Sequence, residues 1–176
     1  SKRTQAKKLS FKSLPIASFK LALAVKPNDK IELKSIDQLL EQKIPFAICN
    51  ENAGAGKKTM AALKKSGHWQ DIYKAAKVNC ATVTECAHSI NSSSDIRAGF
   101  IWDTTAKQFA LRIIELPELN SASSSINVNL TKTENSDAAL HLAHYLSSPE
   151  KSQKIFAKYG FGPRIAKTPS SKLKQP

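Results

Sequence analysis

Three short segments of this sequence place small residues and main-chain donors where strands are predicted to end. The first, 50–56, reads Asn-Glu-Asn-Ala-Gly-Ala-Gly and stands directly before a predicted helix. Small side chains let backbone approach a ligand closely, and the first N–H groups of a helix are unpaired and partly positive. The segment therefore predicts an anion cradle made of main-chain amides. A tight strand-to-helix turn that needs glycine for its geometry alone explains the same residues.

Two further segments fit the same chemistry. Thr82 and Val83 open a predicted helix after a weak strand, so their N–H groups can face the same ligand, and a capped core helix is an equally good interpretation. Trp102 follows a predicted strand and begins a predicted loop, 102–105. Its indole N–H can close over a ligand, or its ring can fill the core. The candidate ligand-binding residues are Ala53, Gly54, Ala55, Gly56, Thr82, Val83 and Trp102.

Other kinds of chemistry find less support in the sequence. Glu51 stands where a phosphate loop ending at Gly56 needs its first glycine, and Lys58 stands where that motif needs serine or threonine. His141 and His144 share a helix face without a third candidate ligand, so no metal site is predicted. No Ser, His and Asp set or Cys and His set is spaced for catalysis. We therefore expect neither enzymatic activity nor a cofactor.

The cysteines Cys49, Cys80 and Cys86 are odd in number and include no CxxC pair. They indicate neither a disulfide framework nor a zinc site. Cys49 stands in an apolar run and is predicted to be a small buried side chain. A disulfide between two of the three stays open on this evidence.

The elements that must position these segments alternate between strands and helices. Predicted strands cover 17–25, 45–49, 77–80, 96–101, 111–116 and 126–130. Predicted helices cover 57–65, 82–90 and 136–146, with short helices after Ser35 and Gly67 and a last helix from Ser148. This alternation predicts an α/β fold with a mostly parallel sheet flanked by helices. Because ligands gather at the carboxyl ends of such strands, we expect 50–56, 81–83 and 102–105 to form one site.

The formal net charge of +13 lies at the two ends of the chain. Residues 1–34 hold nine Lys and Arg against two acids, and residues 151–176 hold seven against none, while the middle is near neutral. A nucleic-acid-binding domain concentrates its bases on the folded surface, so we expect no nucleic-acid partner. Basic ends that aid solubility or attract an anionic membrane surface or an acidic partner are the favoured interpretation. A nucleic-acid binder acting through its tails is the weaker alternative.

Seven motifs occur in order along the chain. They are 21–27 (LALAVKP), 34–40 (KSIDQLL), 53–56 (AGAG), 67–69 (GHW), 96–102 (IRAGFIW), 147–150 (SSPE) and 158–161 (KYGF). No single motif is specific, but their order and spacing together resemble the later two-thirds of molybdate/tungstate-type solute-binding proteins of ABC transporters. The likeness runs from about residue 17 to residue 161.

The resemblance implies a type II periplasmic-binding-protein-like fold, of which this chain is the second lobe and the C-terminal end. It implies backbone donors from Ala53 or Ala55 and from Val83. Trp102 stands where the family has a tyrosine, so an indole replaces a phenol, and Gly54 replaces the family's proline. The implied function is that of a periplasmic or extracytoplasmic receptor that binds a tetrahedral oxyanion, molybdate or tungstate, and partners an ABC transporter permease.

The resemblance also divides the chain. We expect a basic N-terminal segment at 1–16, a solute-binding-protein-like domain at 17–161 and a basic, disordered tail at 162–176. The family's first lobe, which supplies serine donors to the anion, is missing and is expected upstream of Ser1, where a membrane anchor is also an option. The alternative is a degenerate binding-protein domain that serves as a sensor or protein-interaction module without anion transport.

Overall fold

The computed structural model describes residues 10–131 and 136–165, which form two compact units. The larger unit contains Phe19–Ser124 and Lys158–Phe161, and the smaller unit contains 10–18, 125–131, 136–157 and 162–165. Two strands, β1 (Ser10–Val25) and β6 (Ser123–Thr131), have residues in both units. All three segments predicted to form the site belong to the larger unit.

The sheet is mixed, with the strand order β3-β2-β4-β1-β5 and with β6 also paired to β1. The shorter strands are β2 (Phe46–Cys49), β3 (Val78–Cys80), β4 (Ala98–Trp102) and β5 (Arg112–Ile114). β2 runs parallel to β3 and to β4, whereas β1 runs antiparallel to β4 and to β5. The predicted α/β class is confirmed. The expectation of a mostly parallel sheet is too simple, because β1 enters between β4 and β5 in the opposite direction.

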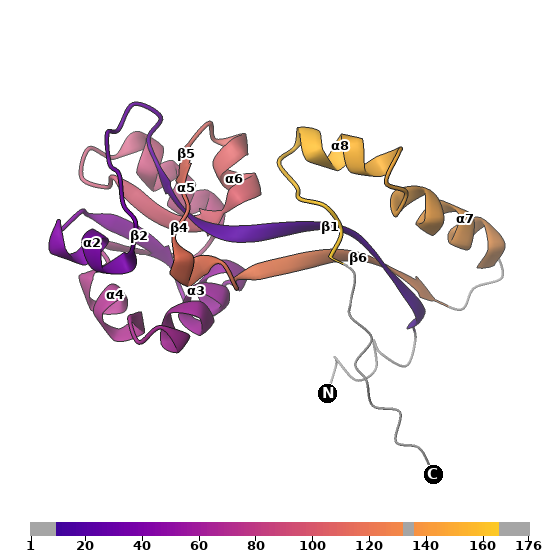
Figure 1. The fold of residues 1–176 in the computed structure, drawn as a ribbon, viewed down its shortest axis with the longest axis horizontal. Coiled ribbons are helices and arrows are strands. Elements are labelled where there is room, and N and C mark those ends of the chain that lie inside the picture. Colours follow the sequence, from indigo (N-terminus) through magenta and orange to yellow (C-terminus); the bar gives the residue numbers. More distant parts are fainter. Residues whose placement is uncertain (1–9, 132–135, 166–176) are drawn as a thin grey trace, which may run out of the picture. The chain divides into compact units, whose positions relative to one another are not determined.

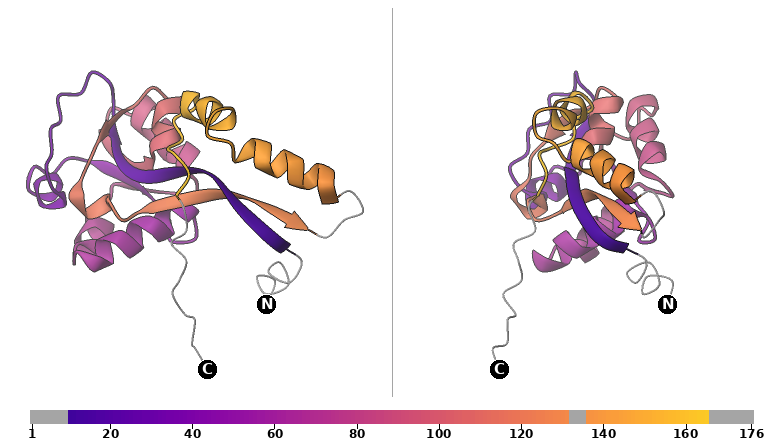
Figure 2. Two further views of the ribbon diagram at one scale, coloured as in Figure 1. Left: turned by 45° about the vertical axis from the view of Figure 1, so that its right-hand side comes forward. Right: turned by 90° about the vertical axis from the view of Figure 1, so that its right-hand side faces the viewer.

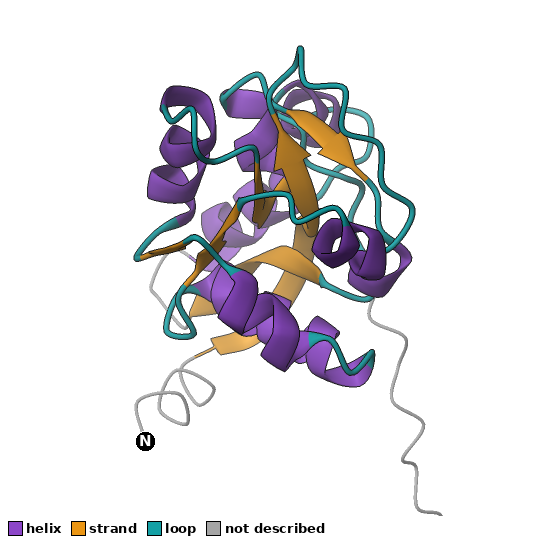
Figure 3. Ribbon diagram, turned by 90° about the vertical axis from the view of Figure 1, so that its left-hand side faces the viewer, coloured by secondary structure: helices purple, strands orange, loops and turns teal. Residues whose placement is uncertain are grey.

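Helices cover both faces of this sheet. They are α2 (Ile36–Glu41), α3 (Gly54–Lys65), α4 (Trp69–Ala75), α5 (Val83–Ser92) and α6 (Asp103–Gln108), with a 3-10 turn, η1, at Pro117–Leu119. The chain moves from β2 to β3 in one direction and from β3 to β4 in the other. Since crossovers between parallel strands are right-handed, α3 and α4 lie on one face and α5 lies on the opposite face (Figure 1). Figure 3 shows helices on both sides of the strands.

The core of the larger unit lies between the sheet and these helices. Every residue of β2 is buried, and the rings of Phe46 and Phe100 meet edge to face with their centroids 5.7 Å apart. Leu63 of α3 and Ile90 of α5 reach the core from opposite faces, and neither is exposed to solvent. Apolar burial on both faces of β2 therefore fixes the strand whose end opens the candidate site.

The smaller unit contains part of the β1 and β6 ribbon with α7 (Ser136–Leu146) and α8, whose bounds are Ser152–Lys158 (Figure 2). Ser18 and Gly162 exchange two backbone hydrogen bonds, of 3.1 and 2.8 Å, which join the C-terminal segment to β1. The hydroxyl of Ser152 donates to the carbonyl of Tyr145 at 2.6 Å and so joins α8 to α7.

The main differences from the predicted element boundaries concern β1, the last helix and residues 102–105. β1 begins at Ser10, seven residues before the predicted start of that strand. The last helix begins at Ser152 instead of Ser148, because residues 149–151 form a turn and the Gln153 N–H donates back to the Ser148 carbonyl. The predicted loop 102–105 is wrong, since α6 begins at Asp103 directly after β4. The predicted disordered tail covers 162–176, and its residues 166–176 lie outside the described part of the chain.

Candidate functional site

The carboxyl ends of β2, β3 and β4 lie next to one another. Cys49 is paired with Cys80 in the parallel β2–β3 ladder, and Ala47 is paired with Gly99 in the parallel β2–β4 ladder. The N–H of Asn50 donates to the carbonyl of Cys80 at 2.8 Å and continues this contact beyond the end of β2. The structure therefore brings the starts of 50–56, 81–83 and 102–105 to one edge of the sheet.

Asn50 organises the turn between β2 and α3. Its side-chain oxygen accepts the N–H groups of Asn52 and Ala53, at 2.9 and 3.1 Å, and its backbone oxygen also accepts the N–H of Ala53, at 3.0 Å. Such side-chain-to-backbone bonds are the usual way in which asparagine stabilises a turn. Because the turn already uses the N–H of Ala53, Ala55 is the better donor of the two expected alternatives.

The first turn of α3 offers the donors that Ala53 does not. The first helical hydrogen bond joins the Lys57 N–H to the Ala53 carbonyl at 2.9 Å. Within the described part of the chain, no hydrogen bond uses the N–H groups of Gly54, Ala55 or Gly56. These are the orphan donors of a helix N-terminus, and they carry its partial positive charge.

The two glycines of this turn have different roles. A Cβ added at Gly56 would lie 1.9 Å from the backbone oxygen of Asn50 and 2.6 Å from that of Cys49. Gly56 therefore lets α3 pack directly against the end of β2. A Cβ added at Gly54 would meet no atom within 4 Å, so this position faces open space. Gly56 therefore fits the geometric interpretation of the segment, while the anion-cradle interpretation stays a prediction.

α5 presents a second helix N-terminus at the same edge. Thr82 is its N-cap and accepts the Glu85 N–H at 3.1 Å, and the Glu85 carboxylate accepts the Ala81 N–H at 2.8 Å. This reciprocal arrangement resembles a capping box and confirms that Thr82 opens the helix. The N–H groups of Val83 and Thr84 have no protein partner among the described residues.

Removal of this cap gives a measurable loss. We expect Thr82→Ala to lower the free energy of unfolding by about 1 kcal/mol, because the Glu85 N–H loses its acceptor. Urea denaturation checks the value, with Thr82→Ser as the control that keeps a hydroxyl at the cap. Equal stability of the alanine and serine variants would show that the cap contributes nothing.

Trp102 lies at the same edge but packs as part of the protein interior. It is the N-cap of α6, and its half-buried ring meets Phe19 of β1 edge to face, with centroids 4.7 Å apart. Phe19 also contacts Phe161, at 6.3 Å. These contacts agree with the core interpretation of Trp102. The sequence gives no signal for Phe19, because β1 reaches this position only through antiparallel pairing, in which Leu21 lies opposite Trp102.

Asp103 adds an acidic group that the sequence analysis did not single out. Its carboxylate accepts the N–H of Thr104 at 2.7 Å. Burial raises the pKa of Asp103, while the backbone N–H groups of Lys20 and Thr104 oppose that rise. A negative charge on this side of the edge disfavours a second anion nearby. The end of the edge formed by α3 and α5, where Lys57 of α3 is exposed, is therefore the better anion position.

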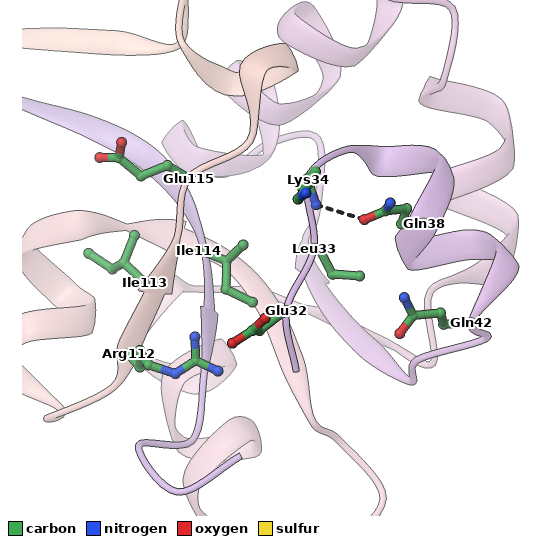
Figure 4. Close-up of a pocket in the computed structure, with 9 residues that line it drawn as sticks. All are labelled: Glu32, Leu33, Lys34, Gln38, Gln42, Arg112, Ile113, Ile114 and Glu115. Carbon is green, nitrogen blue, oxygen red and sulfur yellow. Dashed lines mark hydrogen bonds between the residues drawn. The ribbon is translucent and has the colours of Figure 1, made fainter. Parts of the chain in front are cut away.

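A pocket in the larger unit lies away from this edge. It has a volume of about 450 Å³ and lies between the extended segment 32–34 and β5, beside α2 (Figure 4). Arg112 lines it, but its guanidinium already donates to the carbonyls of Asp29 and Ile31 at 2.7 Å each. The pocket contains none of the predicted site residues.

Within the described ranges, no group of three or more His, Cys, Asp or Glu side chains is placed to hold a metal ion. No helix in those ranges has the length and apolar character that crossing a membrane requires.

Residues 2–162 match the family model of bacterial extracellular solute-binding proteins. The chain belongs to this family. Membership implies an extracytoplasmic location. The match begins within the predicted basic segment 1–16 and so includes most of it. No curated protein matches the chain.

Solved structures of this kind share the fold at low sequence identity. The substrate-binding domain of a molybdenum ABC transporter from Clostridium difficile is 20% identical, with a TM-score of 0.74 over 92% of this chain and 72% of that one. The periplasmic molybdate-binding protein of Azotobacter vinelandii is 16% identical, with a TM-score of 0.61 over 91% and 72%. A phosphate-bound substrate-binding protein of a phosphate ABC transporter from Clostridium perfringens is 13% identical, with a TM-score of 0.56 over 88% and 72%. The periplasmic-binding-protein-like fold is thereby confirmed.

Proposed function

We propose that this solute-binding protein captures a tetrahedral oxyanion through the main-chain amides at the first turns of α3 and α5. The observation that carries the proposal is the meeting of two helix N-termini at the carboxyl ends of neighbouring parallel strands. The unpaired N–H groups there belong to Gly54, Ala55, Gly56, Val83 and Thr84. Helix N-termini bind anions without a charged side chain.

Molybdate or tungstate is the proposed ligand, and phosphate is the main competitor. The motif resemblance and two structural neighbours favour the former, while a third neighbour holds phosphate. Backbone N–H donors recognise the shape and charge of the anion. Trp102 takes part by closing the edge beside the anion with its ring, since it stands where the resembling family has a tyrosine.

The proposed partner is the permease of an ABC transporter, to which the receptor delivers its anion without chemical change. An anion held on a single open lobe stays in contact with water, where each hydrogen bond contributes little. We therefore propose that a further lobe, encoded upstream of Ser1, closes over the anion. Closure of two domains around a ligand is the usual way in which such receptors exclude water.

The anion should stabilise the full-length gene product. At a ligand concentration of 100 times the dissociation constant, binding adds about 2.7 kcal/mol to the free energy of unfolding. For a protein of this size we expect the melting temperature to rise by about 5 to 10 °C. Thermal unfolding is measured with molybdate, tungstate, sulfate and phosphate in turn, with chloride at equal ionic strength as the control. No rise with any of the four anions would contradict the proposal.

A matched pair of variants tests whether the backbone N–H of Gly54 donates to the anion. Gly54 is the first residue of α3 and follows Ala53, whose backbone is extended (φ −70°, ψ 149°), so proline fits at position 54. Gly54→Pro removes the N–H donor, whereas Gly54→Ala keeps it, and a Cβ added at this position meets no atom within 4 Å. We expect the anion-induced rise to shrink in the proline variant alone. An equal rise in both variants would exclude the Gly54 amide as a donor.

A further inference from the structure

Three cysteine thiols gather between the sheet and α5. Cys49 and Cys80 are paired residues on neighbouring parallel strands, so their side chains point to the same face of the sheet. Gly99 lies on that face as well, because its partner Ala47 stands two residues before Cys49. A Cβ added at Gly99 would lie 3.0 Å from the sulfur of Cys86, which places this thiol over the same face. None of the three cysteines is exposed to solvent.

We infer that Cys80 and Cys86 form a disulfide when the protein folds in an oxidising compartment, with Cys49 left as a free thiol. The family is extracellular, and disulfides form and persist in such environments. The thiol of Cys86 interacts with the thiols of both Cys49 and Cys80, so Cys86 can pair with either of them. The inference does not depend on which anion the protein binds.

The position of Cys80 selects it over Cys49 as the partner. Cys80 ends β3, which is the edge strand of the sheet, and the exposed residues Ala81 and Thr82 follow it. Cys49 ends β2, which is flanked by β3 and β4. A small opening of the first turn of α5 therefore uncovers Cys80 and Cys86 together, while Cys49 stays covered by its neighbours.

The reaction is a thiol–disulfide exchange with a small-molecule or protein disulfide as the oxidant. The interaction with Cys86 lowers the pKa of Cys80, and the thiolate is the attacking form of cysteine. The Cys80 thiolate attacks one sulfur of the oxidant and releases the other as a thiol. The Cys86 sulfur then attacks the mixed disulfide at Cys80 and releases the second thiol. Two protein thiols and one disulfide thus become one protein disulfide and two free thiols, with no other redox partner.

The bond would close a ring of residues 80–86 around the start of α5. This ring contains Thr82 and Val83, the cap and the first helical residue. A covalent link at both ends of the segment limits the fraying that helix termini otherwise undergo. The consequence is a more rigid first turn at the candidate anion site.

A peptide map of refolded protein tests the pairing. The chain is unfolded, refolded with oxidised and reduced glutathione, alkylated and digested with trypsin. Residues 78–97 form one tryptic peptide that holds both Cys80 and Cys86, while Cys49 lies in 44–57. We expect peptide 78–97 to lack two hydrogens and peptide 44–57 to be alkylated. Cleavage after Glu85 then leaves the two halves joined until a reductant is added.

Variants and thermal unfolding complete the test. Cys49→Ala should keep the bond, and Cys86→Ala should abolish it. The oxidised wild-type protein should melt about 5 °C above the reduced protein, a difference that disappears in Cys86→Ala. Alkylation of all three cysteines after refolding in the oxidant, or a link between peptides 44–57 and 78–97, would overturn the inference. The wild-type peptide map decides the matter even where a variant fails to fold.

Discussion

The Gly56→Ala variant is expected to lose about 3 kcal/mol or more of its free energy of unfolding. The new methyl group would lie 1.9 Å from the backbone oxygen of Asn50, closer than any unstrained contact. Backbone cannot rotate away as a flexible side chain can, so α3 must shift from the end of β2. Overpacking of this kind costs about 1 to 3 kcal/mol when side chains absorb it, and here backbone has to move. Urea denaturation monitored by circular dichroism measures the loss.

Gly54→Ala is the matched control for this prediction. It replaces a glycine in the same turn, where the added methyl group meets no atom within 4 Å. Alanine is preferred over glycine in a helix by roughly 1 kcal/mol, so this variant should be as stable as the wild type or slightly more stable. If both variants unfold at the same urea concentration, α3 does not pack on β2 through Gly56.

The second large effect is expected from Phe100→Ala, with a loss of about 3 to 5 kcal/mol. Phe100 lies on β4, is fully buried and meets Phe46 of β2 edge to face. Its removal leaves a cavity between the two strands whose carboxyl ends form the candidate site. The free energy of unfolding from urea titration gives the magnitude.

Two further variants separate the contributions of buried volume and of the ring contact to the stability lost in Phe100→Ala. Phe100→Leu keeps most of the buried volume and should lose clearly less than Phe100→Ala. In the double variant with Phe46→Ala, the two losses should not add, because the pair is worth about 0.5 to 1.5 kcal/mol beyond the area that each ring buries. Strict additivity would mean that the two rings stabilise β2 and β4 independently.

The sequence alone determined the features that depend on neighbouring residues. Ser35 and Thr82 each accept a backbone N–H three residues ahead, so their identity as N-caps follows from local geometry. The apolar run before Asn50 predicted the buried β2, and alternation predicted the strand of Leu21. The order of strand-end segments predicted one shared edge, because parallel strands end on the same side of a sheet.

Tertiary structure decided which groups at that edge are free to act. The sequence cannot tell whether Ala53 or Ala55 keeps its N–H, because that depends on how the side chain of Asn50 turns back. It cannot separate Gly54 from Gly56, which differ only in their distance from the end of β2. The sequence also does not show that the thiols of Cys49, Cys80 and Cys86 interact. Cys49 and Cys80 become neighbours only through the pairing of β2 with β3, which joins residues about thirty positions apart. Hydrogen bonds within a turn depend on adjacent residues, whereas strand register and helix packing are set by burial across the whole domain.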